Sequence, residues 1–204
     1  MKEIFGQIKD YLPKFLSPDQ KEKLFAQLDD FPKNIDQRVY TTALADDPGL
    51  FQGDGISDVW VVNLPSENVA RGRCLVISNT CDIAIENKTS LPLRVSYCPI
   101  VSLAKLESLL TETASAAYAQ SFLRDVRLQR ITSMFYLPKG GGLEEDGAAL
   151  LNHTLNCALN KEEHEHLKTH RLFTLSNYGF YLFLFKVSIH FTRIMDGVDR
   201  DVAA

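Results

Sequence analysis

The chain contains 204 residues and carries a formal net charge of −4; 45% of its residues are apolar and 24% are charged. These values are typical of an ordinary globular protein with enough apolar material for a core. The negative balance argues against indiscriminate binding to nucleic acid, which requires a dominating positive field. It leaves selective binding through a local basic patch open.

The four cysteines form no CxxC pair and no dense disulfide framework: Cys74, Cys81, Cys98 and Cys157. Three of them lie in or beside apolar runs, where a reduced thiol packs as a small hydrophobe. We see no secretory signal, and the longest apolar stretch, residues 178–185, is too short for a membrane helix. We therefore expect a cytoplasmic protein with reduced thiols, no cofactor and no membrane contact.

Residues 1–34 predict two helices. The first has apolar residues at helical spacing: Ile4, Phe5, Ile8 and Leu12. The second has a clear start, with Ser17 as the N-cap, Pro18 at the first helical position and Gln20 at the capping-box position. We assign residues 1–44 to an N-terminal helical extension and residues 45–204 to the main domain.

Beyond a loop dense in Asp, Gly and Pro, the apolar pattern becomes that of strands. Strands are expected over residues 58–64, 73–78, 93–101 and 127–137, and at the start of 148–159. Helices are expected over residues 103–125, capped by Ser102, and from Ser176 to about Met195. The fold class is therefore α+β. It comprises a small bent antiparallel sheet or SH3-like barrel with N-terminal helices, a central helix and a C-terminal helix.

Three short motifs share their order and spacing with a known family. They read SDVWVVNL at residues 57–64, RGRCLVISN at 71–79 and CPIVS at 98–102. The segment from about residue 53 to 102 thus resembles the MazF/PemK family of toxin ribonucleases. In that family the strands of an SH3-like barrel read roughly GDVWLVDL and RPALVISN, and a third ends in PIT.

The resemblance implies a bacterial protein of a toxin–antitoxin or phage-defence system. It also implies RNA as a partner, an antitoxin or other protein partner, and a homodimer. In the family, an arginine before the second strand and the threonine of PIT carry RNA cleavage. Aligned on LVISN, these positions fall on Gly72 and Val101, beside Arg71, Arg73 and Ser102. A shift of one residue turns a strand side chain to the opposite face unless a bulge restores its direction.

Arg71 and Arg73 are two residues apart, so in an extended segment they point the same way. Two guanidinium groups can grip a phosphate and stabilise charge that builds on its oxygens, and the Ser102 hydroxyl can supply a positioned hydrogen bond. We take these three residues as candidate catalytic residues and the two arginines as candidate nucleic-acid contacts. The alternative is a pair of solvated charges at a hairpin end.

Cys81 and Asp82 follow three small polar residues at the exit of an apolar strand. We take both as candidate catalytic residues, with Cys81 as the nucleophile, although the charge of Asp82 beside it disfavours a thiolate. The alternative is structural, because side chains of these types bond local backbone amides and fix a tight turn.

Glu162, His166 and His170 share one face of a predicted helix at four-residue spacing, with His164 pointing elsewhere. They form a possible three-ligand metal row, but the surrounding segment is charged throughout and a solvated helix face explains it fully; we assign no metal.

Three functions remain open. The first is a divergent MazF/PemK-like protein that contacts or cleaves RNA with Arg71, Arg73 and Ser102. The second is a catalytically inactive barrel used as a binding or adaptor module. The third is a thiol-dependent enzyme built on Cys81.

Overall fold

The structure, a computed structural model, describes residues 17–33, 35–87 and 91–192. The chain divides into two compact units, residues 1–34 and 35–204. The helix expected around Ile4 to Leu12 lies outside the described residues. Residues 35–44, which the sequence analysis assigned to the extension, belong to the second unit, because the strand they contain pairs within its sheet.

The first unit contains helix α2 (Pro18–Asp29), which begins as predicted. The Ser17 hydroxyl accepts a hydrogen bond from the Gln20 amide at 3.3 Å, and the Gln20 side chain accepts one from the Ser17 amide at 2.9 Å. This reciprocal pair is a capping box, which satisfies two amides that have no partner inside the helix.

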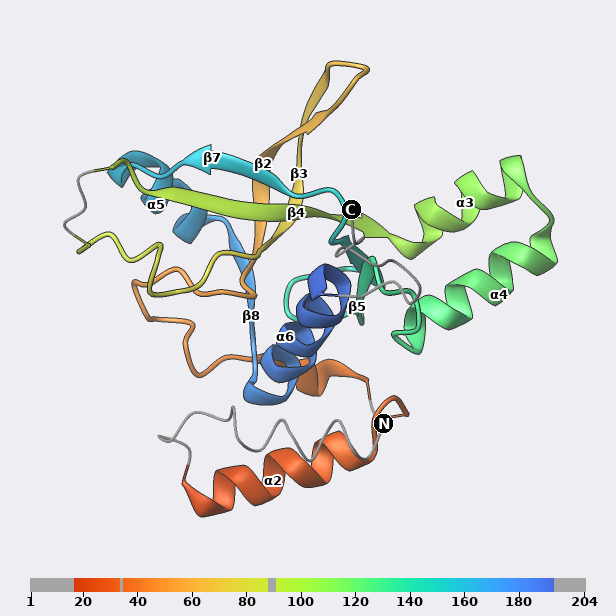
Figure 1. Ribbon diagram of the computed structural model, residues 1–204, viewed down its shortest axis with the longest axis horizontal. Helices are drawn as coiled ribbons and strands as arrows, with labels where there is room; N and C mark the ends of the chain where they lie inside the picture. The colour runs from red at the N-terminus through yellow and green to blue at the C-terminus, as the bar shows by residue number, and fades with distance from the viewer. Residues whose placement is uncertain (1–16, 34, 88–90, 193–204) are drawn as a thin grey trace, which may run out of the picture. The chain divides into compact units, whose positions relative to one another are not determined.

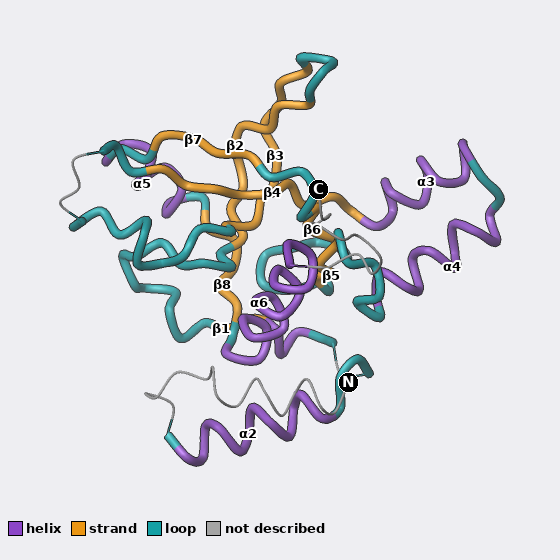
Figure 2. The backbone as a smooth tube through the Cα atoms, in the orientation of Figure 1, coloured by secondary structure: helices purple, strands orange, loops and turns teal. Residues whose placement is uncertain are grey.

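The second unit is built on an antiparallel sheet of eight strands (Figures 1 and 2). Its strands are β1 (Tyr40–Thr41), β2 (Gly55–Asn63), β3 (Asn68–Val76), β4 (Arg94–Ser102), β5 (Met134–Leu137), β6 (Gly147–Leu150), β7 (Leu155–Ala158) and β8 (Arg171–Leu175). Their order is β1-β8-β2-β3-β4-β6-β5, with β7 also pairing β4. The α+β class and the antiparallel sheet are confirmed.

Within the described part of the chain, the strand pairings form an open path and not the closed barrel that we had allowed for. The path ends at β1 and β5, for which no mutual pairing occurs among these residues, and the two halves of β4 pair with different strands. Its first half pairs with β7, as in Val95 with Cys157, and its second half pairs with β6, as in Ile100 with Ala149. The sheet therefore divides at β4.

Five of the elements in the second unit are helical: η1 (Gln37–Val39), α3 (Leu103–Thr113), α4 (Ala116–Arg127), α5 (Lys161–Thr169) and α6 (Asn177–Thr192). The prediction of a single central helix over residues 103–125 is wrong. Ser115 adopts an extended conformation and caps a new helix, so α3 and α4 form a helical hairpin (Figure 1). The helix α4 also occupies the start of the strand expected over residues 127–137.

A bulge in β2 interrupts the regular pairing of this strand with β3. Ile56 pairs with Cys74 and Val59 pairs with Gly72, so Ser57 and Asp58 together face the single residue Arg73. Asp58 has a φ of 56°, a left-handed conformation that is uncommon outside glycine. Bulges of this kind re-aim side chains and often lie next to functional sites.

The core lies in two clusters. One gathers residues of β2, β3, β4 and α5, including Ile56, Val76 and Val95; the other joins Leu123 and Val126 of α4 to the β5–β6 hairpin and α3. Both Cys74 and Cys98 are buried, and all four cysteines are free thiols. Burial raises the pKa of Cys74 to about 12, so this thiol serves as core material, as expected.

None of the helices within the described ranges is both long and apolar enough to cross a membrane.

Candidate functional site: a basic groove beside a histidine pair

A cavity of about 580 Å³ lies between β3 and the start of α3. We call it the β3–α3 groove, and it is lined by Asp58, Arg71, Gly72, Arg73, Ile100, Val101, Ser102, Lys105 and Glu145. The groove brings together the three residues that the sequence singled out, namely Arg71, Arg73 and Ser102. Gly72 and Val101 line the same space.

The cations of the groove differ in how they are engaged. In the part of the chain that the structure describes, the side chains of Arg73 and Lys105 have no hydrogen-bond or ion-pair partner. Glu145 adds one carboxylate to the lining. The groove thus holds more cations than anions, on a chain whose net charge is −4. Such a local excess is what a negatively charged ligand requires.

Ser102 has a structural role that leaves part of its bonding capacity available. Its hydroxyl oxygen accepts a hydrogen bond from the Lys105 amide at 3.0 Å and caps α3, as predicted. A hydroxyl has one hydrogen and two lone pairs, so the hydrogen of Ser102 can still donate to a ligand. The positive end of the α3 dipole adds to the field at this point.

Arg71 is held in place on two sides. Its Nη1 donates to the Asp58 carbonyl oxygen at 2.6 Å and lies 3.2 Å from Asp58 Oδ2. Its guanidinium also lies 4.0 Å from the ring centroid of Trp60, the residue paired with it across the β2–β3 ladder. Half of Trp60 is exposed, so this indole presents a flat apolar face near the groove.

A pair of histidines borders the groove at Asp58. His166 and His170 lie one turn apart at the end of α5, and their ring centroids are 4.2 Å apart. Asp58 Oδ2 lies 3.4 Å from His166 Nε2 and 3.8 Å from His170 Nε2. Arg71 Nη1 lies 3.2 Å from His166 Nε2.

One residue of the suggested three-ligand row, Glu162, lies elsewhere, and His164, which was expected to point elsewhere, is also outside the cluster. Glu162 is exposed in the first turn of α5 and is not part of the cluster, where Asp58 takes its place. His164 is buried and lines a smaller cavity of about 250 Å³ together with Thr80. Four-residue spacing on a helix identified two members of the cluster, and the third came from a strand distant in sequence.

Cys81 and Asp82 are not among the lining residues of the groove. The Cys81 amide donates to Asn79 Oδ1 at 2.9 Å, and its carbonyl oxygen accepts from Asn87 Nδ2 at 2.6 Å. The Asp82 amide donates to the Asn79 carbonyl oxygen at 3.0 Å. These bonds match the anchored turn that was the structural alternative for this segment.

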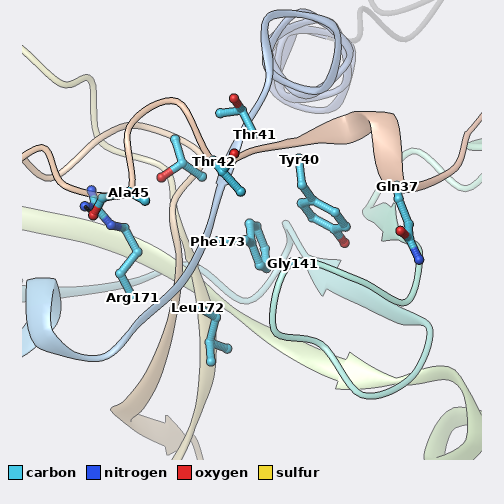
Figure 3. A pocket seen from close by; sticks show the side chains of 10 residues that line it. Gln37, Tyr40, Thr41, Thr42, Ala45, Gly141, Arg171, Leu172 and Phe173 are labelled. Carbon is cyan, nitrogen blue, oxygen red and sulfur yellow. Dashed lines mark hydrogen bonds between the residues drawn. The ribbon is translucent and has the colours of Figure 1, made fainter.

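A second cavity, of about 540 Å³, lies between β1 and β8 (Figure 3). We call it the β1–β8 cavity; its lining includes Tyr40, Gly141, Arg171 and Phe173. In Figure 3 the guanidinium of Arg171 points toward the segment of Ala45. It donates there to four carbonyl oxygens, those of Leu44, Ala45, Asp47 and Gly49, at 2.8–3.2 Å.

Arg171 also neutralises a buried acid. Its Nη1 lies 3.5 Å from Oδ2 of Asp54, which is fully buried. Burial raises the pKa of Asp54, and the bond that the carboxylate accepts from the Phe51 amide opposes this rise. Arg171 therefore ties the loop before β2 to β8, a structural role.

Sequence reasoning missed three residues of the site: Asp58, Trp60 and Lys105. Lys105 carried a usable signal, because it lies one helical turn after the capping serine and therefore near it in space. Asp58 carried none, since its orientation depends on the bulge.

Comparison with known proteins finds no family model that matches this chain, and no curated protein matches it.

Proposed function

We propose that this protein binds single-stranded RNA at the β3–α3 groove, with one phosphate held by Arg73, Lys105 and Ser102. The observation that carries the proposal is the convergence of two unengaged cations and a capping hydroxyl on one cavity. A phosphate oxygen accepts hydrogen bonds from all three groups, and the guanidinium offers a paired, planar contact.

Trp60 supports RNA over an isolated phosphate. An exposed aromatic face beside a phosphate site is the arrangement on which an unpaired base stacks, and arginine planes serve the same purpose. Trp60 and Arg71 already stack on each other at the edge of the groove. A base placed on the outer face of Trp60 would leave the adjacent phosphate near Arg73.

Cleavage of the bound RNA is a second candidate. It is favoured by the lining of the groove, where Arg73 and Ser102 flank the positions that carry catalysis in MazF/PemK toxins. The bulge opposite Arg73 supports the same idea, because it changes the direction that an unbulged strand would impose. The likeness of the three motifs supports a place in a toxin–antitoxin or phage-defence system, with a protein partner and a homodimeric assembly.

Binding is tested with a fluorescently labelled single-stranded RNA and anisotropy at several salt concentrations. Arg73→Ala and Lys105→Ala are each expected to weaken binding about tenfold, and to reduce the slope of log K against log salt by about 0.7. Arg130→Ala is the matched control, because it removes an exposed arginine that is not part of the groove lining. Equal effects of Arg73→Ala and Arg130→Ala would contradict the proposal and favour the binding-module interpretation.

Cleavage is tested on the same RNA by gel electrophoresis, with a 2′-deoxy version as the control. Attack by the 2′-hydroxyl requires that group, so only the ribose form is expected to be cut, and Arg73→Ala is expected to abolish cutting. Intact RNA at saturating protein would leave binding as the function of the groove.

A further inference from the structure

We infer that Asp58, His166 and His170 form a binding site for a divalent transition metal ion, with Zn²⁺ the best match. Their ligand atoms all lie within 4.8 Å of one another. A tetrahedral zinc site with bonds of about 2.0–2.1 Å separates its ligand atoms by about 3.3 Å. The separations of Asp58 Oδ2 from the two imidazole nitrogens, 3.4 and 3.8 Å, are close to that geometry.

The hydrogen bonds assign the tautomer of His170 and are compatible with two tautomers of His166. His170 Nδ1 lies 2.8 Å from the His166 carbonyl oxygen, which can only accept, so Nδ1 carries the proton and Nε2 presents its lone pair to Asp58. His166 Nε2 has two contacts that favour opposite tautomers: it accepts from the Arg71 guanidinium at 3.2 Å when Nδ1 carries the proton, and it donates to the Asp58 carbonyl oxygen at 3.0 Å when Nε2 carries it. Metal binding requires the first tautomer, in which both imidazoles offer an unprotonated nitrogen to the cluster.

The bulge and the end of α5 are fastened together, which holds the ligands in place without a metal. The Ser57 amide and hydroxyl both donate to the His170 carbonyl oxygen, at 2.9 and 3.1 Å. Ser57 precedes Asp58, so the strand that carries the carboxylate is bonded to the residue that carries one imidazole. Preorganisation of this kind reduces the cost of ordering a site when its ligand binds.

The Arg71 guanidinium lies where a metal ion would have to bind in this cluster. Its Nη1 contacts three electron-pair donors: the carbonyl oxygen of Asp58, the carboxylate of Asp58 and His166 Nε2. His166 Nε2 also lies 3.0 Å from the Asp58 carbonyl oxygen, to which it donates in the tautomer protonated at Nε2, and metal binding selects the other tautomer. A metal ion and Arg71 therefore compete for the same donors, and the metal binds when the half-exposed guanidinium moves out.

The donor set indicates the class of ion. Two imidazoles and one carboxylate suit Zn²⁺ with an open position for water, and the same set also takes Fe²⁺ or Co²⁺. Mg²⁺ and Ca²⁺ prefer oxygen ligands such as carboxylates and carbonyls, so a site with two imidazole nitrogens suits them less well than Zn²⁺.

The test is calorimetric titration of the full chain with zinc chloride, in a Cys81→Ser background so that the exposed thiol adds no binding. One zinc ion per chain is expected, with affinity reduced at least tenfold by His166→Ala, His170→Ala or Asp58→Asn. Arg71→Ala is expected to tighten binding severalfold, because it removes the competing cation. His190→Ala, a histidine outside the cluster, is the matched control and is expected to bind as the parent does.

Cobalt in place of zinc gives a second readout, since a His₂Asp site with water produces visible absorption bands that each ligand variant would lose. Thermal unfolding without metal verifies that every variant folds, and Arg71→Ala keeps all three ligands. The inference is overturned by absence of stoichiometric binding, by binding that survives His166→Ala and His170→Ala, or by unchanged affinity in Arg71→Ala. The assay contains no RNA, so its result is independent of the proposed function.

Discussion

The β3–α3 groove and the β1–β8 cavity have similar volumes, about 580 and 540 Å³, and each is lined by at least one arginine. In the β1–β8 cavity, Arg171 donates to four carbonyl oxygens and approaches a buried carboxylate. In the groove, Arg73 and Lys105 line the space without a partner in the described part of the chain. Cavity size and the presence of arginine therefore do not separate the two places.

The two places differ in whether the N–H donors of their cations are already bonded to the protein's own acceptors. A guanidinium whose hydrogens are used by the protein's own carbonyls has little left for a ligand, and removing it unfolds the local structure. An unengaged cation contributes little to folding and keeps its full capacity to bind an anion. The larger role in stability thus belongs to the β1–β8 cavity, and the larger role in binding to the groove.

The strongest test of this contrast is Arg171→Ala. Its removal leaves Asp54 buried without its cation and four carbonyl oxygens without their donor. Breaking a buried ion pair in this way costs about 3–5 kcal/mol. Urea denaturation followed by circular dichroism measures the loss.

The matched control is Arg73→Ala, which removes an arginine that has no such partners. Its free energy of unfolding is expected to stay within about 0.5 kcal/mol of the parent. A loss as large as that of Arg171→Ala would show that the two arginines do not differ as we infer.

Lys186 is a buried cation in α6, and its Nζ donates a hydrogen bond to the Gln129 carbonyl oxygen at 2.5 Å. Burial lowers the pKa of Lys186 from 10.5 to about 8. Between these values the unfolded chain holds a proton that the folded chain has released, so this group's contribution to stability rises with pH. Over that window the rise is about 3 kcal/mol.

Lys186→Met removes the rise. The variant's free energy of unfolding relative to the parent is therefore expected to be most favourable near pH 7 and to decline toward pH 10. Chemical denaturation of both proteins at each pH measures the difference. The subtraction cancels the buried phenols such as Tyr97, whose raised pKa acts in the opposite direction. A difference that is flat with pH would contradict the prediction.

Two glycines test the packing of the two regions, with the smallest expected effects. A Cβ at Gly55 would lie 2.2 Å from the ring of Phe173, which lines the β1–β8 cavity, so Gly55→Ala is expected to cost about 1–3 kcal/mol. A Cβ at Gly72 in the groove would lie 3.4 Å from Val61, an ordinary contact. Gly72→Ala is expected to change stability by less than about 1 kcal/mol.

Melting temperatures of the two variants, measured side by side, show which substitution costs more stability. If Gly72→Ala is the more damaging change, then the groove, and not the β1–β8 cavity, is the tightly packed region.

Local rules accounted for the elements that depend on neighbouring residues. The capping box of Ser17 and Gln20 and the cap of Ser102 are short-range bonds, and both form as expected. The alternating segments that became β2, β3 and β4 were also found. The break between α3 and α4 was missed, because one capping serine in a run of good helix formers competes weakly with continued helix until the two helices can pack.

The residues of the candidate site also fall into those that local spacing predicted and those that it did not. The spacing of Arg71 and Arg73 on one strand placed them together, and the spacing of His166 and His170 on one helix did the same. Asp58 could not be assigned, because its direction comes from a bulge and a left-handed backbone conformation that only the pairing of β2 with β3 creates.

The sequence by itself therefore determined the fold class, the caps and the residues that carry charge, since these follow from periodicity and from bonds between near neighbours. The tertiary structure decided which charges remain available. It gave the donors of Arg171 to a loop more than 120 residues earlier in the chain, left Arg73 unengaged, and brought Asp58 to the two imidazoles. Those outcomes depend on contacts between distant segments, and no local pattern encodes them.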